Sequence, residues 1–279
     1  DRKKIDAVIL ATSTWPEYVP HGAPTVAYEL GINGVPAFDL TAGCGGFGYG
    51  VAVASSLIRS GTATNVLLIG VETMSVSLNP TDRGTAFLFG DGAGAVVIGP
   101  SEENGISPVV WGSDGENADA IGQNLTAIEY MDRAEEYQHK DPEAEPVSRQ
   151  FLQMQGQKVF RWAAITLPKA LAGALDVAGV DSDDIEVFVP HQANARINEL
   201  MRKHLGFPDD LPMANDIERT GNTSAASIPL AIEEMLATGK AQGGQRALIL
   251  GFGAGLSYAA MVAKLPPAPQ LTSFADLQN

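Results

Sequence analysis

Apolar residues along the chain gather in short and long runs, and the two kinds predict different elements. Short, nearly continuous runs at residues 5–10 (IDAVIL), 35–40 (VPAFDL) and 185–189 (IEVFV) predict strands buried in a sheet. Longer runs of small and apolar residues at 47–58 and 157–177 predict helices. Because the two kinds of run alternate along the chain, the pattern predicts an α/β fold.

Two parts of the chain resemble each other in sequence and in spacing. Residues 89–94 (FGDGAG) align with 250–255 (LGFGAG), and the run at 5–10 resembles the run at 185–189. Between these matches Cys44 aligns with Asn222, and a glycine follows each of them at the same distance. The shared order predicts two related α/β halves, each with a strand, a loop, a glycine turn, a helix, a strand and a glycine-rich hairpin.

The repeat divides the chain into a first half at 1–105, an intervening region at 106–150, a second half at 151–265 and a tail at 266–279. Within the intervening region, residues 132–146 are acidic and contain prolines, which predicts an exposed loop. The second half has a helical run before its first strand, whereas the first half opens almost directly with its strand. We therefore expect an opening segment of the first half to be missing from this sequence.

Composition narrows the class of protein. The chain has 45% hydrophobic residues and a net charge of −15, and no apolar run approaches the roughly 20 residues of a membrane span. The negative charge disfavours nucleic acids and anionic membranes as general partners. A single cysteine cannot form an internal disulfide, and no signal-peptide pattern is visible, so we expect a soluble protein of the reducing cytoplasm.

That single cysteine, Cys44, lies in a glycine-rich turn between a predicted strand and a predicted helix. A helix N-terminus stabilises negative charge, and flanking glycines allow a substrate to approach, so this position suits a thiolate nucleophile. Free cysteine is also a common buried residue that packs as a small hydrophobe. The local sequence leaves both interpretations open.

The second half supplies two partners for such a nucleophile. His191 follows the predicted strand at 185–189, at the carboxyl end where open α/β folds place their chemistry. Asn222 lies in the turn that the repeat aligns with Cys44, so a two-fold arrangement of the halves directs its amide toward the thiol. The alternatives are a structural histidine and an ordinary helix N-cap asparagine.

Several motifs of the chain resemble the β-ketoacyl-acyl-carrier-protein synthase III family of thiolase-like condensing enzymes, which begin fatty-acid chains. The resemblance covers residues 5–265. It rests on 42–47 (AGCGGF), 81–84 (TDRG), 89–94 (FGDGAG), 189–194 (VPHQAN) and 221–227 (GNTSAAS). Residues 160–164 (FRWAA) and 215–218 (NDIE) look most like actinobacterial members. The resemblance implies a five-layered αβαβα sandwich of two pseudo-repeated halves, with the first half incomplete at its N-terminus.

The resemblance also implies a ping-pong Claisen condensation that needs no metal or redox cofactor. Cys44 takes an acyl group from acyl-CoA, and the backbone N–H groups of Cys44 and Ala254 form the oxyanion hole. Malonyl-acyl-carrier protein then loses carbon dioxide, and His191 and Asn222 hold the enolate oxygen while the carbanion attacks the acyl-cysteine.

Further positions are assigned by the same resemblance. The coenzyme A and pantetheine channel is implied at Arg83, Gly156, Phe160, Ala193, Asn194 and Arg196. The acidic carrier protein is expected to dock on Arg161, Arg196, Arg202 and Lys203. Val19 and Pro20 match the region that shapes the acyl pocket from the neighbouring subunit of a homodimer. For each set a purely structural role is the alternative, namely an ion pair of Arg83, core packing of Phe160, a solvated helix face or loop packing.

Two rivals to this function stay open on sequence alone. One is a related enzyme on the same fold, such as an acyltransferase or a natural-product ketosynthase with other donors. The other is a truncated, non-catalytic remnant that binds acyl chains. The presence of Cys44, His191 and Asn222 together disfavours the remnant, because binding alone does not require all three.

Overall fold

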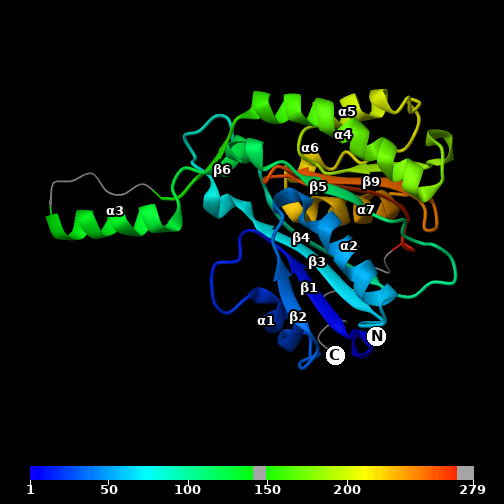
Figure 1. The fold of residues 1–279 in the computed structure, drawn as a ribbon, viewed down its shortest axis with the longest axis horizontal. Coiled ribbons are helices and arrows are strands. Elements are labelled where there is room, and N and C mark those ends of the chain that lie inside the picture. Colours follow the sequence, from blue (N-terminus) through cyan, green and yellow to red (C-terminus); the bar gives the residue numbers. More distant parts are fainter. Residues whose placement is uncertain (141–148, 269–279) are drawn as a thin grey trace.

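Two four-stranded sheets form the body of the protein (Figure 1). The computed structural model describes residues 1–140 and 149–268. The first sheet has the order β2-β1-β3-β4 and the second β5-β10-β9-β8. The strands of the first sheet are β1 (Ala7–Ala11), β2 (Ala37–Leu40), β3 (Val66–Thr73) and β4 (Asp91–Ile98). Those of the second are β5 (Val110–Ser113), β8 (Val187–Pro190), β9 (Arg246–Gly253) and β10 (Ser257–Lys264).

The two sheets repeat one topology. In the first, β1 is parallel to β3 and β3 is antiparallel to β4; in the second, β8 is parallel to β9 and β9 is antiparallel to β10. The match reaches single hydrogen bonds, because the Val8 N–H donates to the Pro36 carbonyl and the Phe188 N–H to the Pro212 carbonyl, both at 2.9 Å. The predicted fold of two related α/β halves is therefore confirmed.

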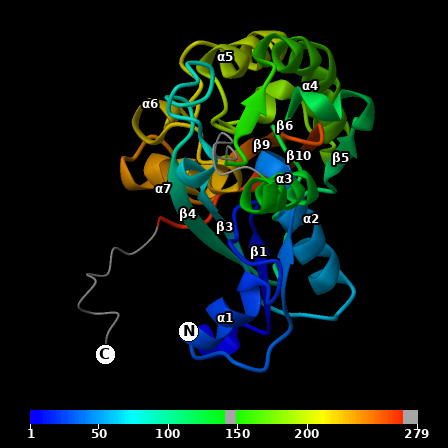
Figure 2. The same ribbon diagram turned by 90° about the vertical axis from the view of Figure 1, so that its left-hand side faces the viewer.

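The helices complete five layers around these sheets (Figure 2). Between the sheets lie α2 (Gly46–Arg59) and α7 (Ser227–Ala237), and their apolar side chains join both inner sheet faces in one core. The outer face of the second sheet carries α4 (Gly156–Ala178) and α5 (Ala195–His204), and the first sheet carries α1 (Gly22–Glu29). The short helix α6 (Ile217–Thr220) precedes the turn that leads to α7.

Close packing fixes the start of α2 between the two halves. A Cβ atom added at Gly50 would lie 2.4 Å from a methyl group of Leu68 on β3, and one at Gly48 would lie 2.8 Å from Ala259 on β10. Only glycine therefore lets the helix contact both sheets at these two points. The start of α2 is consequently held at a fixed depth between the halves.

Two expectations from the sequence are corrected by the structure. Residues 132–140 are not a loop, because they belong to helix α3 (Ala127–Lys140), which extends away from the body in Figure 1; residues 141–146 lie outside the described part. The two glycine-rich segments are not equivalent in the fold. Residues 89–94 run into the start of β4, whereas 250–255 form the end of β9 and the following turn.

The strands β6 (Ile121–Gln123) and β7 (Leu152–Met154) form a separate antiparallel pair. Of the predicted tail, residues 266–268 have no regular structure and 269–279 are not described. Within 1–140 and 149–268, no helix combines the length and apolar character that a membrane crossing requires.

Candidate active site

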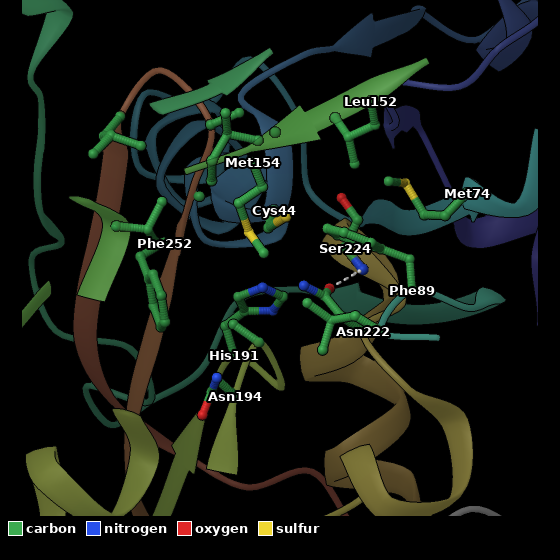
Figure 3. A pocket seen from close by; sticks show the side chains of 18 of the residues that line it. Cys44, Met74, Phe89, Leu152, Met154, His191, Asn194, Asn222, Ser224 and Phe252 are labelled. Atoms are coloured by element: carbon green, nitrogen blue, oxygen red, sulfur yellow. Dashed lines mark hydrogen bonds between the residues drawn. The ribbon is translucent and has the colours of Figure 1, made fainter. Parts of the chain in front are cut away.

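A cavity of about 170 Å³ lies where the two halves meet, and Figure 3 shows side chains from both halves pointing into it. Its walls include Cys44, His191 and Asn222, the three residues singled out from the sequence. Apolar side chains supply most of the remaining surface, namely Met74, Leu88, Phe89, Leu152, Met154, Val159, Phe160, Trp162, Ile197, Phe252 and Leu256. The structure therefore joins the three polar residues in one largely apolar cavity.

Cys44 lies in a 3₁₀ turn, Gly43–Gly45, that leads directly into α2. Its side chain is buried, and burial raises the pKa of the thiol to about 11, with the nearby negative charge of Glu72 adding to the rise. Three donors oppose this effect, namely the Ser224 hydroxyl and the backbone N–H groups of Cys44 and Ala254. The sulfur is therefore a thiol at rest, beside donors that favour negative charge.

The turn after β9 fits closely against the turn of Cys44. A Cβ atom at Gly253 would lie 2.6 Å from the Cys44 Cβ and 2.7 Å from its backbone nitrogen. Gly43 has φ +52°, and a Cβ there would lie 3.1 Å from the backbone nitrogen of Ala254. Glycine at these positions lets the two N–H groups approach the sulfur from opposite halves.

His191 follows β8, and its ring is buried against Phe252 in an edge-on contact with centroids 5.2 Å apart. The ring Nδ1 is 2.5 Å from the Ser227 hydroxyl at the start of α7, whereas Nε2 has no partner within the described residues. Burial lowers the pKa of the imidazole to about 3, so the ring is neutral. With Nδ1 accepting from Ser227, Nε2 carries the proton and is free to donate into the cavity.

Asn222 has an extended backbone that pairs with the segment before β4. Its N–H donates to the Leu88 carbonyl at 2.8 Å, and its carbonyl accepts from the Gly90 N–H at 3.0 Å. The side-chain oxygen accepts from the Ser224 N–H at 2.8 Å, so the alternative role as a cap of the next turn is real. That bond also orients the amide, because it leaves the NH₂ group facing His191 in Figure 3.

Cys44 and His191 therefore do not form a thiolate–imidazolium pair. The same desolvation raises one pKa and lowers the other, so both groups are neutral at neutral pH. The cavity instead offers a thiol under two backbone donors and, across from it, two neutral side-chain donors. Such an arrangement stabilises oxyanions that develop at two separate points.

Two residues that contact this centre were not assigned a role from the sequence. Ser227, which positions His191, lies inside the quoted 221–227 motif but was given no role of its own. Glu72 is only 2% exposed and accepts hydrogen bonds from side chains around the sulfur. One sequence feature could have singled out Glu72, because it is a charged residue inside an otherwise apolar strand-like run, LLIGVETM at 67–74.

Four of the six residues implied for the coenzyme A channel line the cavity, namely Gly156, Phe160, Ala193 and Asn194. Arg83 and Arg196 are exposed and do not line it. Among the described residues no ion pair of Arg83 is found, so the proposed alternative of a salt bridge to Asp82 or Asp91 is absent there. The Asn194 side chain caps α5 by accepting from the Arg196 N–H at 2.9 Å.

The residues expected to dock the carrier protein divide into two kinds. Arg161, Arg196 and Lys203 are exposed. Arg202 is different, because its side chain is 12% exposed and its guanidinium pairs with Glu199 at 2.8 Å and Asp209 at 2.6 Å. Its charge is therefore already neutralised within the chain, which argues against a place for Arg202 in the docking set.

Val19 and Pro20 do not line the cavity of their own chain. Val19 is 84% exposed and the neighbouring Tyr18 is 81% exposed, on the loop between β1 and α1.

No group of three or more histidine, cysteine, aspartate and glutamate side chains with metal-binding geometry occurs in the part of the chain that the structure covers.

Comparisons with known proteins agree with this geometry. The family model 3-oxoacyl-[acyl-carrier-protein (ACP)] synthase III matches residues 38–115, and the model of the C-terminal part of that synthase matches 175–265. The chain is 55% identical to the β-ketoacyl-[acyl-carrier-protein] synthase III of Mycobacteroides abscessus, over 95% of this chain and 76% of that protein. It is 52% identical to the mycobacterial β-ketoacyl-[acyl-carrier-protein] synthase III of Mycobacterium avium, over 94% of this chain and 75% of that protein.

Solved structures show the same architecture. The priming β-ketosynthase of the R1128 polyketide biosynthetic pathway superposes with a TM-score of 0.89 at 40% identity, covering 96% of this chain and 77% of that one. The 3-oxoacyl-(acyl carrier protein) synthase III of Pseudomonas aeruginosa superposes with a TM-score of 0.83 at 38% identity, covering 96% and 79%. The sequence comparison and the structure comparison thus both find 3-oxoacyl-[acyl-carrier-protein] synthase III enzymes.

Proposed function

The chain belongs to the β-ketoacyl-[acyl-carrier-protein] synthase III family, and from this premise we propose that it condenses an acyl-CoA with malonyl-acyl-carrier protein, the step that starts a fatty-acid chain. One observation carries the proposal above the others. Cys44, His191 and Asn222 meet in a single cavity, with the N–H groups of Cys44 and Ala254 directed at the sulfur.

In the first half-reaction the Cys44 sulfur attacks the thioester carbon of acyl-CoA. The new bond joins that carbon to Cys44, the bond to the coenzyme A sulfur breaks, and coenzyme A leaves as its thiol with the proton that Cys44 gave up. The N–H groups of Cys44 and Ala254 hold the oxyanion of the tetrahedral intermediate. Such a pair of fixed donors is worth several kcal/mol, roughly 2.7–4 for each donor.

In the second half-reaction the malonyl group on the carrier protein loses carbon dioxide, and the electron pair of the broken bond moves into the thioester as an enolate. His191 Nε2–H and the Asn222 NH₂ group donate to the enolate oxygen. Their neutrality supports this role, because a neutral donor stabilises the developing charge and still releases it. The carbanion then attacks the acyl carbon on Cys44, which departs as a thiolate and regains a proton.

The approach to this centre is assigned to residues on the cavity wall and its surroundings. Gly156, Phe160, Ala193 and Asn194 contact the pantetheine arm, and the exposed guanidinium groups of Arg83 and Arg196 bind phosphate. The acidic carrier protein docks on Arg161, Arg196 and Lys203 by charge complementarity. Arg202 is left out because Glu199 and Asp209 already pair with it.

The proposed working form is a cytoplasmic homodimer. The exposed Tyr18 and Val19 suit a subunit interface, so that Val19 and Pro20 shape the acyl pocket of the neighbouring subunit. A nucleophilic thiol with no second cysteine to protect it suits a reducing compartment. The two half-reactions proceed without a redox or metal cofactor, because every charge that develops has a donor in the chain.

The rivals raised by the sequence fit less well. A natural-product ketosynthase is represented by the R1128 priming enzyme at 40% identity, below the 55% of the β-ketoacyl-[acyl-carrier-protein] synthase III of Mycobacteroides abscessus. A non-catalytic remnant would not need Cys44, His191 and Asn222 around one cavity with an unpartnered His191 Nε2.

The test is the intact mass of the protein after incubation with acetyl-, isobutyryl- or dodecanoyl-CoA, followed by addition of malonyl-acyl-carrier protein. We expect an acyl adduct that is absent from Cys44→Ala and is discharged as β-ketoacyl-carrier protein. A folded protein that acquires no adduct from any donor would contradict the proposal.

A further inference from the structure

Glu72 on β3 is a buried carboxylate close to the nucleophile, and the two half-reactions give it no role. It is 2% exposed and forms no ion pair within the residues that the structure describes. An unpaired buried carboxylate destabilises a fold unless hydrogen bonds compensate it, so its presence calls for an explanation. Burial raises the pKa of this carboxyl group, while its hydrogen bonds act in the opposite direction.

Four donors surround the carboxylate. One oxygen accepts from the Ser13 N–H at 3.0 Å, the Thr14 hydroxyl at 2.6 Å and the Thr12 hydroxyl at 3.3 Å. The other oxygen accepts only from the Ser224 hydroxyl, at 3.0 Å. Ser224 and Cys44 line the same cavity, and the serine side chain favours negative charge on the Cys44 sulfur, so Ser224 lies beside both the carboxylate and the thiol.

Ser224 is held in this bridging position by the backbone. It is the single non-glycine residue with a positive φ, +51°, among those described, and such a conformation is strained for a residue that has a side chain. Its N–H donates to the Asn222 side chain, and β3 approaches the turn so closely that a Cβ at Gly70 would lie 2.3 Å from the Ala225 carbonyl oxygen. The strained serine and the close strand together hold the Ser224 hydroxyl against Glu72 at the wall of the cavity that contains Cys44.

We propose that Glu72, Ser224 and Cys44 form one unit that holds a single negative charge, which passes from the carboxylate to the sulfur when Cys44 attacks. The thiol proton moves to the Ser224 oxygen while the serine proton moves to Glu72, so a thiolate and a neutral carboxylic acid result. No net charge is created in the desolvated cavity, and a second negative charge there is opposed by repulsion. In this proposal Glu72 acts through Ser224 and is a positioning residue, and Ser224 is the residue that exchanges a proton with the reacting sulfur.

The other ionisable groups near this unit do not replace Glu72. His191 is neutral and bonded to Ser227, and on the paired strand β4 the carboxylate of Asp91 is directed to Ser75. The remaining contacts of Glu72, from the loop after β1 and the turn before α7, come from uncharged side chains and one backbone N–H. Coupled titration therefore involves Glu72 and Cys44 alone among these neighbours.

The experiment measures how fast Cys44 reacts from pH 5 to pH 10, with iodoacetamide and, separately, with acyl-CoA in single turnovers. In the wild type we expect the rate to rise until Glu72 has lost its proton and then to stay level through the neutral range, because the charge is shared. In Glu72→Gln we expect the rate to rise about tenfold per pH unit throughout and to exceed the wild-type rate in alkaline solution.

Three variants separate this account from a structural role. Glu72→Asp keeps a carboxylate and should restore the level profile, and Thr12→Val removes one hydrogen bond of Glu72 but should keep that profile. Ser224→Ala should lower the rate at every pH without changing its slope. A level profile in Glu72→Gln, whatever its height, would overturn the proposal.

The acyl-CoA arm rests on the proposed function, whereas the iodoacetamide arm does not. One outcome is that alkylation gives a level profile in the wild type and a rising one in Glu72→Gln, while no acyl-CoA loads the protein. This outcome would contradict the proposed function and support the shared charge. The other outcome is that acyl-CoA loads the wild type and Glu72→Gln with the same pH profile, which would support the proposed function and contradict the shared charge.

Discussion

The turn of Cys44 and the turn of Asn222 occupy matching places in the two halves, yet they present different groups to the cavity. Each is followed by a helix whose end is marked by a glycine with a left-handed backbone, Gly61 at φ +74° and Gly239 at φ +73°. However, α2 has 14 residues and α7 has 11, so the second helix begins about one turn later.

That single turn decides which groups are available. Cys44 lies at the start of its helix, where backbone N–H groups have no helical partner and can serve an oxyanion. Asn222 lies ahead of its helix, and its backbone N–H and carbonyl are already hydrogen-bonded to Leu88 and Gly90. Only its side chain is therefore available to the cavity. Under the proposed function, the turn of Cys44 therefore serves the covalent step and the turn of Asn222 serves the enolate.

The largest effect is expected from removing the nucleophile. Cys44→Ala should lose β-ketoacyl product by on the order of 10⁴-fold or more, because no acyl-enzyme can form. Product formation from acyl-CoA and malonyl-acyl-carrier protein, together with intact mass, measures it. An acyl adduct that survives on another residue would contradict the assignment.

Substitutions of Asn222 and His191 should impair condensation but not acyl loading. Asn222→Asp keeps the oxygen that bonds to Ser224 but loses the amide donor, and His191→Ala loses the Nε2 donor. Each should lower condensation about 10²–10³-fold while acyl loading of Cys44 continues. Single-turnover loading and steady-state condensation, measured side by side, separate the two steps. The exposed Asn215→Asp is the matched control, and loading that falls in parallel with condensation would break the comparison.

A third prediction concerns the contact between the two turns. Gly253→Ala places a methyl group where Cys44 already lies, so the nucleophile must shift by a few tenths of an ångström or more. Misplacement of this kind costs up to about 10²-fold in the rate of loading. Gly105→Ala serves as control, because nothing lies within 4 Å of a Cβ at that position. Normal loading by Gly253→Ala would show that the close fit is not needed.

The last prediction concerns stability and not a reaction rate. The pKa of His191 is about 3 in the folded protein, whereas a histidine in the unfolded chain has its ordinary pKa of 6.5. Between pH 3 and pH 6.5 the unfolded chain therefore binds more protons than the folded protein. The free energy of unfolding should therefore fall as the pH drops from about 6.5 toward 3, with a contribution of up to about 1.4 kcal/mol per pH unit.

Chemical denaturation at a series of pH values measures this slope. His191→Gln should lack the contribution, whereas His204→Gln, which changes an exposed histidine, should keep it. Equal slopes for the wild type and His191→Gln would mean that burial does not suppress the charge of the ring.

Much of this comparison was predictable from the sequence. The shared spacing around Cys44 and Asn222 predicted two related halves, and His191 was predicted from its place after a buried strand. Neighbouring residues in sequence determine such features. The charge sharing of Glu72 was not predictable, because it depends on the approach of β3 to the turn of Ser224 across 152 residues of sequence.

Other misses have equally local reasons. The glycine-rich segments at 89–94 and 250–255 look alike in sequence although their glycines have different structural roles. In 89–94 two of the glycines let β4 contact α7, whereas in 250–255 the last glycine lies in the turn after β9. Residues 132–140 of α3 were predicted as a loop because the stretch 132–146 is acidic and contains prolines, but Pro142 and Pro146 both come after the last residue of the helix. The pairing of Arg202 requires Asp209 to fold back from the end of α5.

The division of labour between Cys44 on one side and His191 and Asn222 on the other is tested most directly by the release of carbon dioxide from malonyl-acyl-carrier protein in the absence of acyl-CoA. Cys44→Ala should still decarboxylate malonyl-carrier protein, because His191 and Asn222 remain, whereas His191→Ala should lose this activity and still accept an acyl group. Loss of decarboxylation in folded Cys44→Ala, or its survival in His191→Ala, would contradict the account.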